Sequence, residues 1–174
     1  MIAAKIDFQR LSLKDALDLA ILIEEEAHDR YLEFADQMET HRTPEAASFF
    51  RWMSVNEARH GEELRERRER MFPLQPRTVS RSMLFDVEAP EYDEARAFMT
   101  PREAMAAALR SEEKAHAFFV AALPHASDPE VKALFEELRD EEVEHQELVK
   151  KEMARLEPET GPHPGDFTDG PVAQ

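Results

Sequence analysis

The stretch that decides the fold is the tetrapeptide EARH at residues 57–60, which recurs as EVEH at residues 142–145. Each copy has the form Glu-x-x-His and follows, by about 30 residues, a glutamate on an apolar helical stripe: Glu24 in the first half and Glu112 in the second. The two halves thus contribute four carboxylates and two imidazoles. A four-helix bundle uses this combination of side chains to hold two metal ions in its core.

Length, composition and charge favour a single helical domain. The chain has 174 residues, of which 42% are hydrophobic, and only four are glycines. A chain of this size forms one domain with a substantial core. The formal net charge of −16 would repel a phosphate backbone, so we expect no nucleic-acid partner, and the same field favours accumulation of cations.

The chain contains no cysteine, which excludes disulfides, zinc knuckles and a four-cysteine iron site. The apolar run at residues 16–23 is short, contains Asp18 and ends in three glutamates. It is therefore neither the core of a secretory signal nor a membrane span. We expect a cytoplasmic protein with no membrane partner.

Start signals predict four helices. Ser12 with Asp15 forms a capping-box pattern, and Thr43, Thr100 and Asp128 each precede a proline at the first helical position. The predicted helices run over residues 13–40, 44–72, 101–123 and 129–156.

The connections predict how these helices are arranged. Short links around residues 41–42 and 124–127 make antiparallel neighbours of the first pair and of the second pair. The long stretch 73–100 then serves as a crossover between the two hairpins. Residues 1–156 would form one all-α, ferritin-like four-helix bundle, and residues 157–174, rich in proline and glycine, would form a flexible tail.

Three-four spacing puts one glutamate near the middle of the apolar stripe of each helix. A buried carboxylate is costly unless it is paired or bound to a metal. Four carboxylates balance the charge of two divalent cations, and a set rich in carboxylates and capped by imidazoles suits iron or manganese. The predicted metal ligands are Glu24, Glu57, His60, Glu112, Glu142 and His145.

Two alternatives stay open at the level of sequence. A single Glu-x-x-His on a charged helix is common, so the acidic residues could face solvent in a plain helical bundle. His28 and His116 each follow a seam glutamate by four residues. They could be ligands, proton donors or groups behind the ligands, or simply histidines on the flank of the seam.

At these residues the chain resembles the rubrerythrin-like branch of the ferritin-like di-iron superfamily, over residues 13–156. The resemblance includes Glu24-x-x-Ala27-x-x-x-Tyr31, its counterpart at residues 112–119, and both Glu-x-x-His pairs. It implies that the six predicted ligands bind two iron ions, with Glu57 and Glu142 bridging them and Tyr31 lying near the site. It also makes Asn56 and Glu141 candidates to hydrogen-bond the histidine of the opposite hairpin.

The sequence departs from the relatives at informative positions. Ala115 stands where rubrerythrins carry an extra glutamate, and the absence of cysteine leaves no rubredoxin domain. Ala58 stands where bacterioferritins place a haem-binding methionine, so no haem is expected. A clear fifth helix is missing, which argues against a ferritin storage shell.

The resemblance implies an oxidoreductase that holds two iron ions, with manganese as an alternative. Such a protein would oxidise Fe(II) or reduce peroxide or dioxygen, with an electron donor that the sequence does not identify. The alternatives are an iron-storage or delivery accessory and a non-catalytic acidic interaction protein. The likeness also favours a homodimer.

Overall fold

The structure is a computed structural model that describes residues 6–40, 43–81 and 100–156. It contains four helices: α1 (Leu13–Thr40), α2 (Pro44–Met71), α3 (Pro101–Ala122) and α4 (Pro129–Met153). A short 3-10 turn, η2 (Leu123–His125), follows α3. These three described segments contain no strand, so the all-α prediction is confirmed. The predicted tail and residues 82–99 of the predicted crossover lie outside the described residues.

Three of the four predicted helix starts are built as expected. The hydroxyl of Ser12 accepts a hydrogen bond from the backbone N–H of Asp15 at 3.1 Å. Thr100 and Glu103 form a complete capping box, in which each side chain accepts from the backbone N–H of the other residue. The carboxylate of Asp128 accepts from two backbone N–H groups in the first turn of α4. These bonds satisfy N–H groups that have no partner within the helix.

The prediction for Thr43 was wrong in its detail. Its hydroxyl makes no capping bond to α2 but donates to the carbonyl oxygen of Met38, 2.8 Å away. The same carbonyl accepts from the backbone N–H of Thr43. Because the last carbonyls of a helix also lack partners, Thr43 closes the end of α1 instead of the start of α2.

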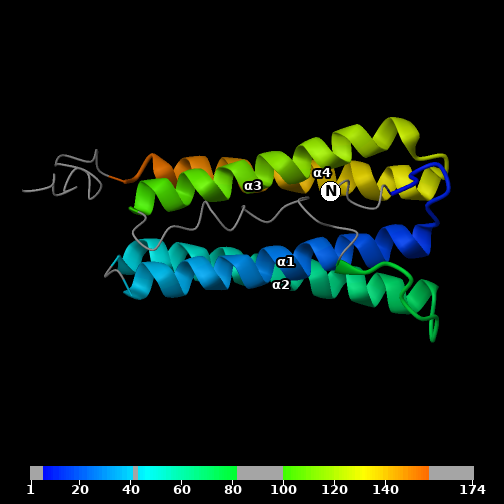
Figure 1. The fold of residues 1–174 in the computed structure, drawn as a ribbon, viewed down its shortest axis with the longest axis horizontal. Helices are drawn as coiled ribbons and strands as arrows, with labels where there is room; N and C mark the ends of the chain where they lie inside the picture. The colour runs from blue at the N-terminus through cyan, green and yellow to red at the C-terminus, as the bar shows by residue number, and fades with distance from the viewer. Residues whose placement is uncertain (1–5, 41–42, 82–99, 157–174) are drawn as a thin grey trace, which may run out of the picture.

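The helices form two antiparallel hairpins, α1 with α2 and α3 with α4, which pack against each other (Figure 1). The end of α2 and the start of α3 lie at opposite ends of the bundle (Figure 1). Helices α2 and α3 therefore run in the same direction (Figure 1).

The beginning of the crossover is fastened to α1 by a buried ion pair. Arg68 donates to the carboxylate of Asp18 at 2.8 Å and to the carbonyl oxygens of Phe72 and Gln75 at 2.8 and 2.7 Å. Lys14 contributes a second cation, 3.2 Å from Asp18. Asp18 is completely buried, and the sequence analysis did not anticipate this role because the residue lay in an apolar run.

The apolar core is divided into two clusters along the bundle axis. The first contains residues from the beginning of α1, the end of α3 and the beginning of α4. The second contains residues from the second half of α1, the beginnings of α2 and α3, and the end of α4. Glu24 of α1 separates the cluster members Ile23 and Ala27, and Glu112 of α3 separates Ala108 from Phe119. The seam glutamates therefore form a polar layer between two hydrophobic blocks.

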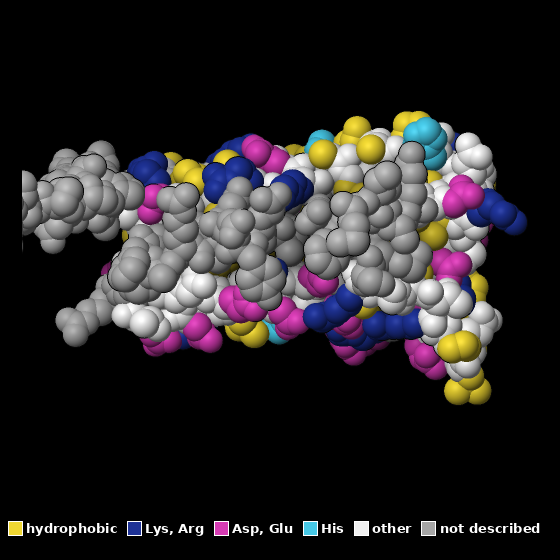
Figure 2. Space-filling model, viewed as in Figure 1, with side chains coloured by type: hydrophobic (Ala, Val, Ile, Leu, Met, Phe, Trp, Pro, Cys, Tyr) yellow, Lys and Arg dark blue, Asp and Glu magenta, His cyan; other side chains and the backbone are white. Residues whose placement is uncertain are grey.

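Outside this layer the helices carry a mixed charged surface. Figure 2 shows basic and acidic side chains interspersed on one face of the described helices. Within the described residues, none of the helices is long and apolar enough to span a membrane.

Candidate metal centre

The seam glutamates are buried in all four helices. Glu24, Glu57, Glu112 and Glu142 are each at most 4% exposed, as is His145 of α4. His60 of α2 is partly buried. The antiparallel pairing within each hairpin brings the six predicted ligands into one layer, because each helix contributes its glutamate from the same depth. The structure therefore brings together every residue that the sequence analysis proposed as a ligand.

His145 lies among three carboxylates that come from three helices. Its Nδ1 atom is 3.5 Å from Glu57 Oε1, 3.4 Å from Glu112 Oε2 and 3.9 Å from Glu142 Oε2. Candidate ligand oxygens of Glu112 and Glu142 lie within 4.8 Å of each other, and carboxylates that close cannot both stay ionised without a cation beside them. The arrangement concentrates donor atoms where one positive ion could neutralise several of them.

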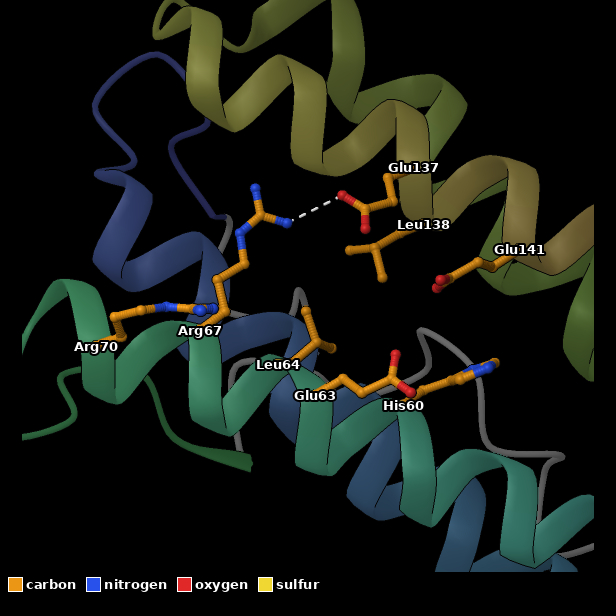
Figure 3. A pocket seen from close by; sticks show the side chains of 8 residues that line it. All are labelled: His60, Glu63, Leu64, Arg67, Arg70, Glu137, Leu138 and Glu141. Atoms are coloured by element: carbon orange, nitrogen blue, oxygen red, sulfur yellow. Dashed lines mark hydrogen bonds and ion pairs between the residues drawn. The ribbon is translucent and has the colours of Figure 1, made fainter.

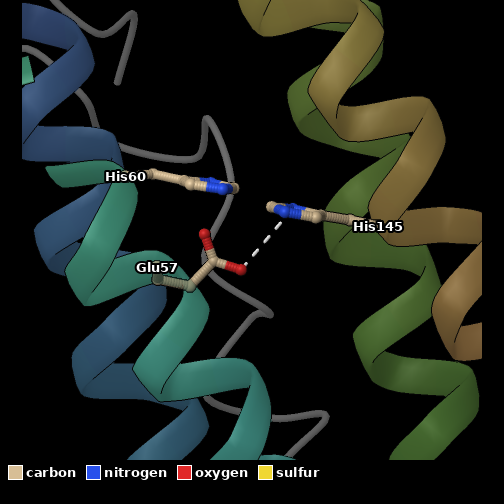
Figure 4. A group of neighbouring side chains, drawn as sticks. All are labelled: Glu57, His60 and His145. Atoms are coloured by element: carbon tan, nitrogen blue, oxygen red, sulfur yellow. Dashed lines mark ion pairs between the residues drawn. The ribbon is translucent and has the colours of Figure 1, made fainter. Parts of the chain in front are cut away.

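The two histidines of the repeated motif face each other across the hairpins. Their ring centroids are 5.2 Å apart, and the ring planes differ by only 3°. Figure 4 shows the carboxylate of Glu57 reaching from α2 toward His145. Burial, together with the neighbouring His145 and Arg59, lowers the pKa of His60 to about 4. His60 is thus neutral at pH 7, which is the form that binds metals.

Glu24 completes the layer from α1. Its Oε2 atom is buried and has no hydrogen-bonding partner among the described residues. Burial, followed by the negative charge of Glu57, raises the pKa of Glu24 well above its usual range. Gly61 of α2 allows this close packing, because a Cβ atom there would lie 3.3 Å from the Cβ of Glu24.

Tyr31 of α1 is in direct contact with the layer. Its hydroxyl donates a hydrogen bond to Glu112 Oε1, and its ring is 3% exposed and stacks on Phe50. The sequence analysis placed Tyr31 near the site by resemblance alone. The contact with Glu112 gives it a definite partner there.

The layer has the donor atoms that a metal centre needs. Three groups of side chains hold their candidate ligand atoms within 4.8 Å of one another: Glu57, His60 and His145; Glu112, Glu142 and His145; Glu24, His60 and Glu141. The buried Glu24 Oε2 and His60 Nδ1 atoms have no hydrogen-bonding partner among the described residues. A buried polar atom without a partner lowers the stability of the fold, and a bound cation would supply the missing partner. Carboxylate and imidazole donors of this kind fit iron or manganese.

The flanking histidines differ from the ligand candidates. The Nδ1 atom of His28 is 2.8 Å from the carbonyl oxygen of Ser54, so its ring donates to α2 and links the two helices. His116 is partly buried. Neither residue belongs to a metal-binding group found in the described part of the chain. The structure thus assigns His28 a bridging contact and leaves His116 outside the cluster.

Two cavities adjoin the layer. One, of about 340 Å³, is lined by Glu24 and Glu57 together with His28, Arg65 and Arg81. The other, of about 170 Å³, lies between α2 and α4 and reaches His60 and Glu141 (Figure 3). Both give a small solute access to residues of the layer.

The two crossed hairpins and the buried carboxylate-histidine layer define a ferritin-like bundle of the carboxylate type. The family model described as Rubrerythrin matches residues 15–153, and a second match covers residues 103–168. The chain belongs to the rubrerythrin family.

A solved structure agrees with this assignment. The chain is similar to an uncharacterized conserved protein from Magnetospirillum magnetotacticum MS-1, with 31% sequence identity and a TM-score of 0.68. The similarity covers 87% of this chain and 99% of the other. No curated protein matches the chain.

Proposed function

We propose that this protein binds two iron ions in the polar layer and oxidises Fe(II) at the expense of peroxide or dioxygen. The observation that carries the proposal is the buried Glu24 Oε2 atom, which has no hydrogen-bonding partner among the described residues, beside a histidine held neutral. Membership of the rubrerythrin family supports a carboxylate di-iron centre. The reaction and the choice of iron over manganese are our inference.

The ligand assignment follows the helices. Glu24 and His60 would hold one ion from the first hairpin, and Glu112 and His145 would hold the other from the second. Glu57 and Glu142 would bridge the pair. The closeness of Glu57 to His145, 3.5 Å between the hairpins, supports a shared role for this carboxylate.

Two bound Fe(II) ions would supply two electrons, which together with two protons reduce hydrogen peroxide to two water molecules. The chain's own residues prepare the site for this chemistry. The hydroxyl of Tyr31 holds Glu112 by donating a hydrogen bond. The two apolar clusters exclude bulk water on either side of the layer, which strengthens its electrostatic interactions.

The test is metal loading followed by oxidation. Anaerobic titration with Fe(II) should saturate at two ions per chain, and stopped-flow mixing with peroxide should then oxidise both. The double variant Glu57→Ala, Glu142→Ala should lose this stoichiometric binding, whereas Glu113→Gln, at an exposed position of α3, should keep it. Retention of both ions by the double variant would show that the layer is not the metal centre.

The same experiment separates the other functions. Uptake of iron far beyond two ions per chain would indicate a storage or delivery protein. Iron binding without any redox change on addition of peroxide would indicate a structural metal in an interaction protein.

A further inference from the structure

Glu141 of α4 lies close to two of the predicted metal ligands, Glu24 and His60. It lies on α4 and lines the groove between α2 and α4, across from His60 (Figure 3). One candidate ligand atom of Glu141 lies within 4.8 Å of those of Glu24 and His60. Three helices therefore converge on this point: α1 through Glu24, α2 through His60 and α4 through Glu141.

The other acidic residues of the groove are already paired. Glu137 accepts a hydrogen bond from Arg67 at 2.9 Å, and Glu63 accepts one from Arg59 at 3.0 Å. Within the described part of the chain, Glu141 makes no ion pair with a basic residue. Its half-buried carboxylate is thus available to a cation, in contrast to the exposed carboxylates of Glu63 and Glu137.

The two partners of Glu141 in this cluster point to a ligand independently of it. Glu24 is 96% buried, since its exposure is 4%, and its Oε2 atom lacks a hydrogen-bonding partner among the described residues. The Nδ1 atom of His60 is also buried and also lacks a hydrogen-bonding partner among the described residues. A cation bound by Glu24 and His60 would therefore have a carboxylate oxygen of Glu141 within reach.

We propose that Glu141 is a seventh ligand of the centre, joining Glu24 and His60 on one divalent transition-metal ion, Fe(II) or Mn(II). The inference rests on the proposed function, because it presupposes that the polar layer binds metal. It differs from the role implied by family resemblance, in which Glu141 only hydrogen-bonds His60. The groove would then be a route to the metal centre, because a cation that enters it would meet Glu141 and His60.

A glutamine at this position separates the two roles. The amide oxygen of glutamine can accept a hydrogen bond from a histidine as a carboxylate can, whereas a neutral amide is a much weaker ligand for a divalent cation. The matched control is Glu137→Gln, which removes a carboxylate from the same groove one turn earlier on α4. Both variants change the net charge equally, so a general electrostatic effect would appear in both.

The full chain would be titrated with Co(II), whose visible absorption reports the number of ligands and which does not oxidise under these conditions. In Glu141→Gln we expect one of the two ions to bind at least about tenfold more weakly, because losing a ligand should cost no less than losing a residue that only supports a ligand. Its absorption spectrum should also change. Glu137→Gln should retain both the affinity and the spectrum.

A crystal structure of the Zn(II)-loaded wild type gives a second readout that needs no variant. An oxygen of Glu141 should lie about 2.0–2.2 Å from one ion, the usual length of a zinc–carboxylate bond. A Glu141 carboxylate that contacts only His60, or an unchanged Co(II) spectrum in Glu141→Gln, would overturn the inference while leaving the proposed function intact. Failure of the wild type to bind Co(II) or Zn(II) would overturn both.

Discussion

Glu24 should lower the stability of the folded protein when no metal is bound. It is a carboxyl group in the core whose pKa is raised by burial and by the charge of Glu57. Without a metal, Glu24→Gln should raise the free energy of unfolding at pH 7, because the neutral amide removes the cost of ionising a buried carboxyl group. With metal present the order should reverse, because the variant loses a ligand. Thermal unfolding with and without Co(II) measures both effects.

The pH dependence of this difference has a defined sign. A carboxyl whose pKa is raised in the folded state binds more protons there than in the unfolded chain, so its presence lowers stability as pH rises above the ordinary value of 4.5. The advantage of Glu24→Gln in the metal-free protein should therefore be absent below that pH and grow above it. An advantage that is constant with pH would contradict burial of an ionisable Glu24.

Tyr31 provides a milder test of the layer. Tyr31→Phe removes the hydroxyl that donates to Glu112 and keeps the ring that stacks on Phe50. Both metal ions should still bind, while the loss of one buried hydrogen bond should lower the free energy of unfolding by about 1 kcal/mol. Chemical denaturation and metal titration of the same preparation check the two expectations. Loss of an ion in this variant would show that Tyr31 does more than orient Glu112.

Sequence reasoning found the ligand candidates because their pattern repeats and because a carboxylate on an apolar stripe is conspicuous. It did not find the buried pair of Asp18 and Arg68. Asp18 interrupts an apolar run, and its partner at helical spacing, Lys14, gives no sign of a contact with α2. Arg68 sits among other charged residues of the same kind. Only the antiparallel packing of α1 and α2, with 50 residues between the partners, brings these two together.

At the level of the helix, that ion pair joins the start of α1 to the end of α2. Removing one member leaves the other charge buried, which typically costs 3–5 kcal/mol. We expect Asp18→Ala to lower the free energy of unfolding by about that amount, as measured by urea denaturation. The control is Asp140→Ala, whose pair with Arg139 is exposed and should contribute less than about 1 kcal/mol.

A smaller result for Asp18→Ala would mean that Lys14 and Arg68 find other partners when the carboxylate is removed. Arg68 already donates to two carbonyl oxygens beyond α2, so part of its charge has an alternative. The double variant Asp18→Asn, Arg68→Met would then remove both charges while keeping side chains of similar size. Its stability should lie closer to that of the wild type, because neither charge is left alone.

Helix boundaries were well predicted where local chemistry determines them. Proline at the first position and a capping side chain identify the starts of α3 and α4 without reference to tertiary contacts. The ends were less accurate: α4 was expected to reach residue 156 and ends at Met153. Helix ends depend on weaker signals, and Thr43 shows that a capping residue between two helices can serve either one.

For the whole molecule, the polar layer links metal binding to stability. The two hairpins meet at residues that are costly to bury and that a cation would neutralise. Saturating Co(II) should therefore raise the midpoint of thermal unfolding, by an amount that grows with ligand concentration as linkage requires. Differential scanning calorimetry with and without a chelator measures it. Equal midpoints in the two samples would indicate that metal does not bind the folded protein.

The repeated motif also has a geometric consequence. Each hairpin carries one glutamate and one Glu-x-x-His pair, and α1 and α3 run in opposite directions (Figure 1). A rotation of half a turn about an axis between the hairpins would approximately exchange them, and the nearly parallel rings of His60 and His145 are compatible with that operation. In symmetry terms the chain is a pseudo-dimer of hairpins, and Glu141 is a place where the halves differ, because Asn56 is the matching residue of the first hairpin.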